Sequence, residues 1–216
     1  AADYDTCGRE KQFQSTRGDL VTVNYVTYGT KLDVEAEKAY LLEALQNRAG
    51  NQAAAPGEAA GTQGAADSDV SDGTEMHVPA YIQKGYVRGL DDIGDTYIEI
   101  DMTEQKMYYY AAGELELETD IVTGNTGRRM GTPQGINYIH GKQRNQILRG
   151  ADYESFVKYW VPVVGNIGIH DASWRGSFGG QIYQTGGSHG CINTPTANMS
   201  QLYEMVEVGM PVIMFY

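Results

Sequence analysis

The chain has 216 residues, with 28 acidic side chains against 16 basic ones, a net charge of −12 and a pI near 4.7. This length suits one large or two modest domains, and either can bury a sizeable core. The acidic balance argues against a nucleic-acid partner, because phosphate binding relies on clusters of Lys and Arg. The sequence has no apolar run of membrane-spanning length and opens without a charged-then-apolar leader. We therefore expect membrane attachment only through an anchor upstream of residue 1.

Residues 1–50 predict a small α+β domain. Apolar and polar residues alternate over 20–26, which is typical of a half-buried strand. Asp33 is a good N-cap for a helix that runs to about Arg48, and Gly50 is the expected stop. The helix carries one apolar stripe, formed by Val34, Leu41, Leu42 and Leu45.

Residues 51–94 predict a flexible insertion and linker. From Asn51 to Gly73 the chain consists almost entirely of Ala, Gly, Gln, Ser, Asp and Glu. Such a composition buries too little apolar surface to offset the entropy lost on ordering. We expect this stretch to be mobile and to be the first site of cleavage in limited proteolysis.

Residues 95–216 predict a mainly β domain with one main helix, arranged as a β-sandwich or barrel-like sheet. In the stretch from Glu114 to Val122, Glu alternates with Leu, so its carboxylates are expected on a solvated face. The helix is expected from Pro195 to about Val208, and the apolar residues 212–216 predict a closing strand inside a sheet. The remaining strands are expected at 96–101, 106–110, 136–140, 159–164 and 166–170.

The segment Ser188-His189-Gly190-Cys191 places a thiol beside an imidazole in a glycine-rich turn. A cysteine reacts as the thiolate, so a nucleophilic Cys needs a base, a cation or a helix N-terminus nearby. Thr194-Pro195 predicts the N-cap and first residue of a helix whose positive end would face the sulfur. The N–H groups of Gly190 and Cys191 are the expected oxyanion donors. A disulfide between Cys7 and Cys191 would consume the nucleophile, so both are expected to be free thiols.

His170, followed about twenty residues later by Ser188-His189-Gly190-Cys191-Ile192-Asn193, resembles the motif of the YkuD-family L,D-transpeptidases. The resemblance runs from about residue 95 to 216, and the preceding region resembles an incomplete N-terminal domain of Gram-positive members. It implies cross-linking of bacterial peptidoglycan outside the cell membrane, without a cofactor or metal. Cys191 would attack the carbonyl before D-Ala in a tetrapeptide stem, and an amine of a neighbouring stem would take the acyl group. It also implies that carbapenem β-lactams acylate Cys191, whose thiolate would already be paired with imidazolium, and leave Cys7 unmodified.

The resemblance assigns the base to His170, with its ring held by a main-chain carbonyl near Asp171 rather than by the Asp171 carboxylate. Ser188 and His189 would shape the pocket. The expected substrate contacts are Trp174, Arg175 and Asn193, and many family members carry Arg at the last of these positions.

Three other functions fit some of these residues. Water in place of the acceptor amine would make the protein an L,D-carboxypeptidase. A non-catalytic wall-binding module would need a defect in the motif, and none is visible. His170, His189 and Cys191 could form a three-ligand zinc site, or serve as buried structural residues.

Overall fold

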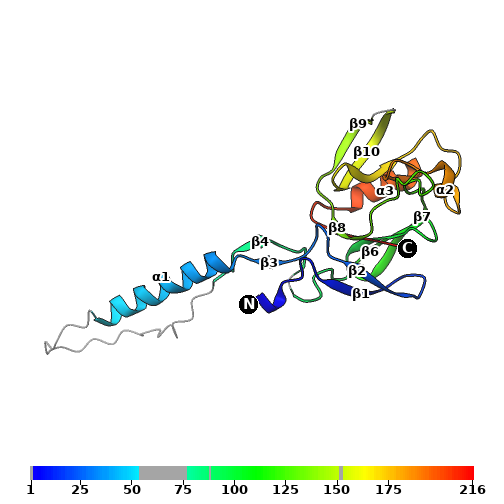
Figure 1. The fold of residues 1–216 in the computed structure, drawn as a ribbon. Helices are drawn as coiled ribbons and strands as arrows, with labels where there is room; N and C mark the ends of the chain where they lie inside the picture. Colours follow the sequence, from blue (N-terminus) through cyan, green and yellow to red (C-terminus); the bar gives the residue numbers. More distant parts are fainter. Residues whose placement is uncertain (1, 54–76, 88, 151–152) are drawn as a thin grey trace, which may run out of the picture.

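The computed structural model describes residues 2–53, 77–87, 89–150 and 153–216, and these are mainly β (Figure 1). Its largest sheet has the strand order β7-β6-β5-β13-β8, formed by Glu114–Asp120, Lys106–Ala111, Tyr97–Asp101, Pro211–Phe215 and Gly135–Tyr138. A four-stranded sheet has the order β12-β11-β10-β9, formed by Ile192–Thr194, Ile167–Asp171, Glu154–Val164 and Gln143–Arg149. The main helix of this region is α3, Thr196–Met205, and α2, Ile182–Gly186, is shorter. The predicted mainly β fold with one main helix is therefore confirmed.

Strand β13 lies inside the large sheet, as its apolar sequence predicted. It runs parallel to β5 and antiparallel to β8, and all five of its residues are buried. Successive side chains of a strand point to opposite faces. Val212 and Met214 accordingly belong to one core cluster, and Ile213 and Phe215 belong to another. A strand that is apolar at every position thus has cover on both faces of its sheet.

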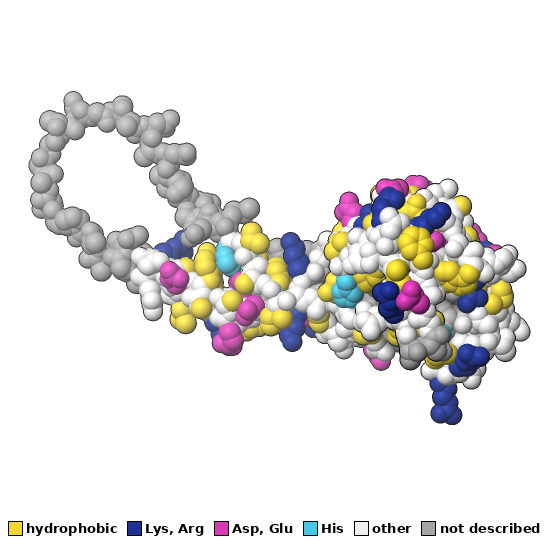
Figure 2. Space-filling model, turned by 90° about the horizontal axis from the view of Figure 1, so that it is seen from above, with side chains coloured by type: hydrophobic (Ala, Val, Ile, Leu, Met, Phe, Trp, Pro, Cys, Tyr) yellow, Lys and Arg dark blue, Asp and Glu magenta, His cyan; other side chains and the backbone are white. Residues whose placement is uncertain are grey.

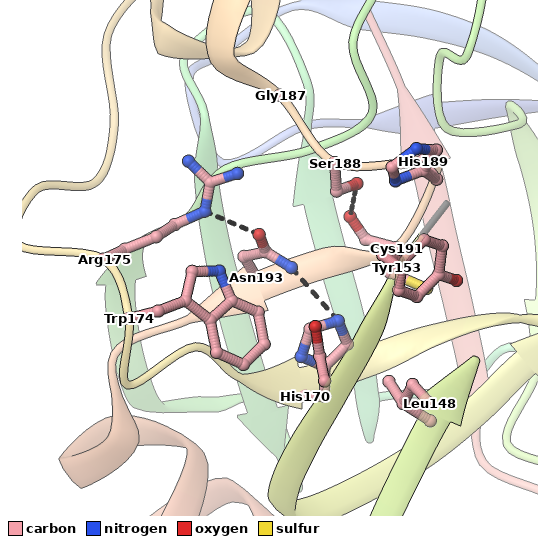
Figure 3. A pocket seen from close by; sticks show the side chains of 11 residues that line it. Leu148, Tyr153, His170, Trp174, Arg175, Gly187, Ser188, His189, Cys191 and Asn193 are labelled. Carbon is pink, nitrogen blue, oxygen red and sulfur yellow. Dashed lines mark hydrogen bonds between the residues drawn. The ribbon is translucent and has the colours of Figure 1, made fainter. Parts of the chain in front are cut away.

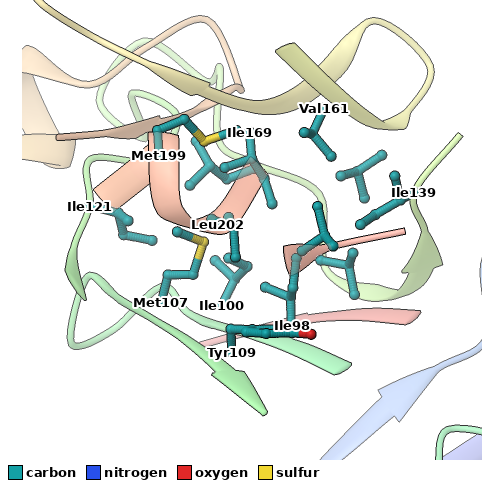
Figure 4. Close-up of a cluster of buried hydrophobic side chains, with 14 of the residues drawn as sticks. Ile98, Ile100, Met107, Tyr109, Ile121, Ile139, Val161, Ile169, Met199 and Leu202 are labelled. Carbon is teal, nitrogen blue, oxygen red and sulfur yellow. The ribbon is translucent and has the colours of Figure 1, made fainter. Parts of the chain in front are cut away.

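The first core lies between the two sheets, with α3 packed into it (Figure 4). It joins Ile100 and Met107 of the large sheet to Val161 and Ile169 of the four-stranded sheet and to Leu202 of α3. Each of these side chains is fully buried, which stabilises the fold by about 1.5–3 kcal/mol apiece. This core fixes β10, β11 and β12, the strands next to which the predicted functional residues lie.

An N-terminal hairpin covers the other face of the large sheet. Its strands, β1 (Glu10–Gln14) and β2 (Leu20–Asn24), pair antiparallel along their whole length. Phe13 packs edge to face on Tyr97, with ring centroids 5.7 Å apart, and lies 6.0 Å from the Phe215 ring. The sequence predicted β2 but missed β1, because Phe13 is the only buried residue of this otherwise polar strand.

Two buried carboxylates of β5 hold the turn of this hairpin. Arg17 Nη1 donates to both carboxylate oxygens of Asp101, at 2.9 and 3.1 Å, and the Asp101 side chain is fully buried. Thr16 donates its N–H and its hydroxyl to Glu99, at 2.9 and 2.7 Å. Burial raises the pKa of Glu99, and the two bonds from Thr16 oppose that rise. The hairpin therefore contacts the predicted catalytic region closely, and the division into residues 1–50, 51–94 and 95–216 stays a prediction.

Helix α1, Val34–Ala53, begins where the sequence predicted and ends later. The Ala36 N–H bonds to Asp33 Oδ1 at 3.0 Å, which confirms Asp33 as the N-cap. The helix continues through Gly50, so the predicted stop is wrong. A glycine ends a helix by adopting the left-handed conformation, and Gly50 remains helical instead.

The predicted apolar stripe of α1 is exposed among the described residues. Leu41, Leu42 and Leu45 are 55%, 60% and 63% accessible. The helix extends away from the sheets on the arm that also carries β3 (Lys31–Leu32) and β4 (Tyr81–Gln83), and apolar side chains are visible on the surface of this arm (Figures 1 and 2). The predicted mobile stretch, 51–73, begins with the last residues of α1, and its other residues lie outside the described ranges. Within those ranges no helix has the length and hydrophobicity to cross a bilayer.

Candidate active site

Two neighbouring parallel strands bring the predicted nucleophile and base to one pocket. In β11 and β12, Ile169 lies beside Ile192 and His170 beside Asn193. Strand alternation then places Cys191, directly before β12, on the same face as His170 and Asn193. All three line a pocket of about 230 Å³ (Figure 3).

Gly168 precedes the base on β11 and leaves room for its surroundings. A Cβ at this position would lie 2.8 Å from the Trp160 indole and 2.4 Å from the Val161 carbonyl oxygen. Trp160 also lies beside the imidazole of His170, with ring centroids 5.9 Å apart. The Gly-Ile-His sequence therefore provides a gap for an aromatic ring, a core residue and the imidazole in consecutive positions.

The His170 ring is held by a hydrogen bond at each nitrogen. Nδ1 lies 2.9 Å from the Asp171 carbonyl oxygen, and Nε2 lies 3.1 Å from Asn193 Nδ2. A carbonyl oxygen can only accept, so Nδ1 carries the proton and Nε2 accepts from the Asn193 amide. The Asp171 carboxylate turns elsewhere and accepts from the Tyr159 N–H at 2.9 Å. The expected main-chain support of the ring is confirmed.

Burial sets the protonation of both reactive groups. It lowers the pKa of His170, which is 3% exposed, and raises the pKa of Cys191, with a backbone hydrogen bond from Gly168 opposing the rise. Cys191 Sγ lies 3.8 Å from the Asn166 carbonyl oxygen, and the hydrogen bonds of the described residues include none between Sγ and His170. Both pKa directions favour the neutral thiol and the neutral imidazole, so the expected thiolate–imidazolium pair stays a prediction that no contact among the described residues supports.

The N-terminus of the following helix does not face the Cys191 sulfur, contrary to expectation. Helix α3 begins at Thr196 with Pro195 as its N-cap, not with Thr194, whose buried hydroxyl finds no partner among the described residues. Cys191 lies at the opposite end of β12. Five extended residues span about 16 Å at 3.3 Å each. The positive end of a helix dipole acts mainly within about one turn of the helix N-terminus, so it does not reach the sulfur.

The turn before the thiol is closed by its own polar groups. Ser188 Oγ donates to the Cys191 carbonyl oxygen at 2.5 Å and accepts the Gly190 N–H at 3.0 Å. Gly190 has a φ of 120°, a conformation open mainly to glycine. Since the Gly190 N–H already donates to Ser188 Oγ, it would have to leave this bond to act as an oxyanion donor, and the expected donor pair stays a prediction. His189 is exposed, and its ring stacks on Tyr153 with centroids 4.6 Å apart.

Trp174, Arg175 and Asn193 all line the pocket, as expected of substrate-contacting residues. Arg175 Nε donates to Asn193 Oδ1 at 2.6 Å, which turns the Asn193 amide nitrogen toward His170. The Trp174 ring lies 5.9 Å from the His170 ring and is 50% exposed. Asn193 is therefore a support of the base as well as a wall of the pocket.

The sequence reading missed the wall formed by the β9–β10 hairpin, which contributes Leu148, Tyr153 and Ser155. No local pattern in the sequence marked Tyr153 as a pocket residue. As for the zinc alternative, no three His, Cys, Asp or Glu side chains converge as metal ligands would within the described ranges. His170, His189 and Cys191 thus share a pocket wall without forming a ligand set.

Comparison with known proteins identifies the family. The protein-family model of the YkuD L,D-transpeptidase catalytic domain matches residues 95–214. A crystal structure of an Enterococcus faecium L,D-transpeptidase with a Cys-to-Ser mutation is 34% identical, with a TM-score of 0.75 over 99% of this chain and 77% of that one. The avibactam carbamoyl enzyme of Ldtfm is 35% identical, with a TM-score of 0.75 over 99% of this chain and 75% of that one. The chain therefore belongs to the L,D-transpeptidase family.

A further solved structure adds a drug adduct. The ertapenem-acylated catalytic domain of the E. faecium L,D-transpeptidase is 45% identical, with a TM-score of 0.52 over 56% of this chain and 98% of that domain. The search of curated proteins gave no significant match.

Proposed function

We propose that this L,D-transpeptidase cross-links peptidoglycan stems with Cys191 as the nucleophile and His170 as the base. The observation that carries the assignment is the β11–β12 register, which puts both side chains in one pocket. Nε2 is the unprotonated nitrogen of His170, and it takes the thiol proton once it exchanges its hydrogen bond from the Asn193 amide for one from the thiol. The family and the solved relatives support the reaction class. The substrate places the enzyme at the cell wall, on the outer side of the membrane.

In the first half-reaction the Cys191 thiol moves from the Asn166 carbonyl toward the substrate and adds to the carbonyl carbon before D-Ala. Its proton passes to His170 Nε2, and the Cys191 N–H donates to the oxyanion. Collapse breaks the C–N bond, and imidazolium returns the proton to the departing amine of D-Ala. A thioester remains on Cys191.

In the second half-reaction an amine of a neighbouring stem adds to the thioester carbonyl and loses a proton to His170. Collapse then releases the Cys191 sulfur, which regains a proton, and leaves a new amide bond between two stems. If water replaces the amine, the same steps give an L,D-carboxypeptidase. The ratio of cross-linked to hydrolysed product separates the two activities.

Mass spectrometry tests this proposal with one defined tetrapeptide donor, with and without an acceptor stem. We expect loss of D-Ala, a thioester on Cys191 and a dimer of stems. Ertapenem should form one covalent adduct, mapped to Cys191, because Cys191 lines the same pocket as the base His170 and Cys7 does not line it. Cys191→Ser should form neither the dimer of stems nor the ertapenem adduct, whereas Cys7→Ser should form both. An adduct on Cys7, or full activity of Cys191→Ser, would contradict the assignment.

A further inference from the structure

Arg175 lines the active-site pocket without an anionic partner among the described residues. Its Nε bond to Asn193 is the one hydrogen bond of its side chain within those ranges, and the two terminal nitrogens point away from Asn193 (Figure 3). The ion pairs found in the described part of the chain do not include it. Arg17, Arg144 and Arg149, by contrast, each pair with a carboxylate. Four N–H donors of the Arg175 guanidinium are therefore available to a ligand.

The lack of a partner is not a shortage of carboxylates, since the chain has 28 acidic side chains and a net charge of −12. Asp171, the carboxylate nearest in sequence, binds the Tyr159 N–H instead. Burial lowers the pKa of Arg175, and no attractive charge offsets it. A half-buried cation without a counter-ion is unfavourable, so an anion that enters with the substrate would stabilise it.

The position of Arg175 indicates which substrate group it can meet. Its Nε lies 2.6 Å from Asn193 Oδ1, and the Cα atoms of Asn193 and Cys191, two extended residues apart on the same strand face, are separated by about 6.6 Å. A carbonyl carbon ready for attack lies about 3–3.5 Å from its nucleophile. One extended residue adds about 3.3–3.6 Å. A group held by Arg175 therefore lies about one residue beyond the reacting carbonyl.

We propose that Arg175 binds the C-terminal carboxylate of the donor stem and so selects donors that end one residue after the reacting carbonyl. The inference rests on the proposed function, in which that last residue is the leaving D-Ala. The two terminal nitrogens of the guanidinium present a planar fork that matches a carboxylate, while Nε keeps its bond to Asn193. A donor that ends in an amide loses the charge-assisted bonds.

The test compares two tetrapeptide donors with Lys at the third position, one ending in D-Ala and the other in D-alaninamide. Wild-type kcat/KM should favour the acid by about 10- to 100-fold. Arg175→Gln should bring the ratio of acid to amide close to one. Asn193→Ala, which keeps the guanidinium, should slow both donors and preserve the preference. Arg144→Gln removes an arginine that pairs with Glu204 and should leave both rates unchanged.

A second donor pair tests whether Arg175 instead binds a carboxylate on the side chain of the third stem residue. Both of its members end in an amide, and the side chain of the third residue carries either a free or an amidated carboxyl group. If Arg175→Gln alters the preference in this pair and not in the first, the assignment to the D-Ala terminus is wrong. An equal loss on acid and amide donors would also overturn it, because Arg175 would then act only through Asn193. Failure of the proposed function differs from both, since wild type would then form no acyl-enzyme at Cys191 with any donor, and both proposals would fall.

Discussion

The buried thiol and imidazole predict slow alkylation of the free enzyme at neutral pH. With the pKa of Cys191 raised and that of His170 lowered by burial, the thiol keeps its proton at pH 7 and the ring stays neutral. An ordinary thiol carries only a few per cent thiolate at about pH 7, and Cys191 carries less. Below the thiol pKa the thiolate fraction rises tenfold per pH unit, so the rate with iodoacetamide should rise about tenfold per unit through neutral pH.

The assay uses the Cys7→Ser protein, in which Cys191 is the remaining thiol. Alkylation is followed by intact mass between about pH 6 and pH 10, which spans the ordinary pKa values of imidazole and thiol. His170→Gln should show the same steep profile, because a neutral ring does not hold a thiolate. A fast rate that stays flat between about pH 6 and pH 8, and that falls in His170→Gln, would refute the neutral pair and restore the thiolate–imidazolium reading.

Two other contacts give direct predictions. Arg17→Met should lower the free energy of unfolding by about 3 kcal/mol, because the buried Asp101 carboxylate loses its cation. Urea unfolding measures this change, and a loss under about 1 kcal/mol would mark the pair as no stronger than an exposed one. Asn193→Asp places a carboxylate against His170 Nε2, so it should raise the pKa of His170, because a nearby negative charge stabilises the imidazolium. The acidic limb of the acylation rate should then move to higher pH, and an unchanged limb would argue against the Asn193–His170 contact.

Sequence patterns correctly predicted those elements whose structure depends on residues close together in the chain. Asp33 caps α1 because its side chain reaches an N–H three residues away, and the apolar residues of β13 demanded a strand covered on both faces. Patterns failed where distant packing decides. Gly50 does not end its helix, and Tyr153 reaches the pocket only because the β9–β10 hairpin lies beside His189. No property of these residues in the sequence carries that information.

Adjacency in sequence also misled the reading of the thiol's environment. Thr194 and Pro195 follow Cys191 closely, which suggested that the helix N-terminus would face the sulfur. The intervening residues are extended, so each adds about 3.3 Å, whereas helical residues would add 1.5 Å. The distance between a thiol and a helix N-terminus that follows it in the sequence therefore depends on the secondary structure of the residues between them.

The gap between His170 and the Ser188-His189-Gly190-Cys191 segment, by contrast, has a structural meaning that the sequence does carry. Parallel neighbours cannot be joined by a tight hairpin and need a crossover of about a dozen residues or more. The stretch between β11 and β12 meets that need and includes α2. Parallel pairing sets His170 beside Asn193, and alternation then sends Ile192 into the core while Cys191 and Asn193 face the pocket. A gap of hairpin length would reverse the second strand and change the residue paired with the base, so the spacing is a requirement of the site's geometry.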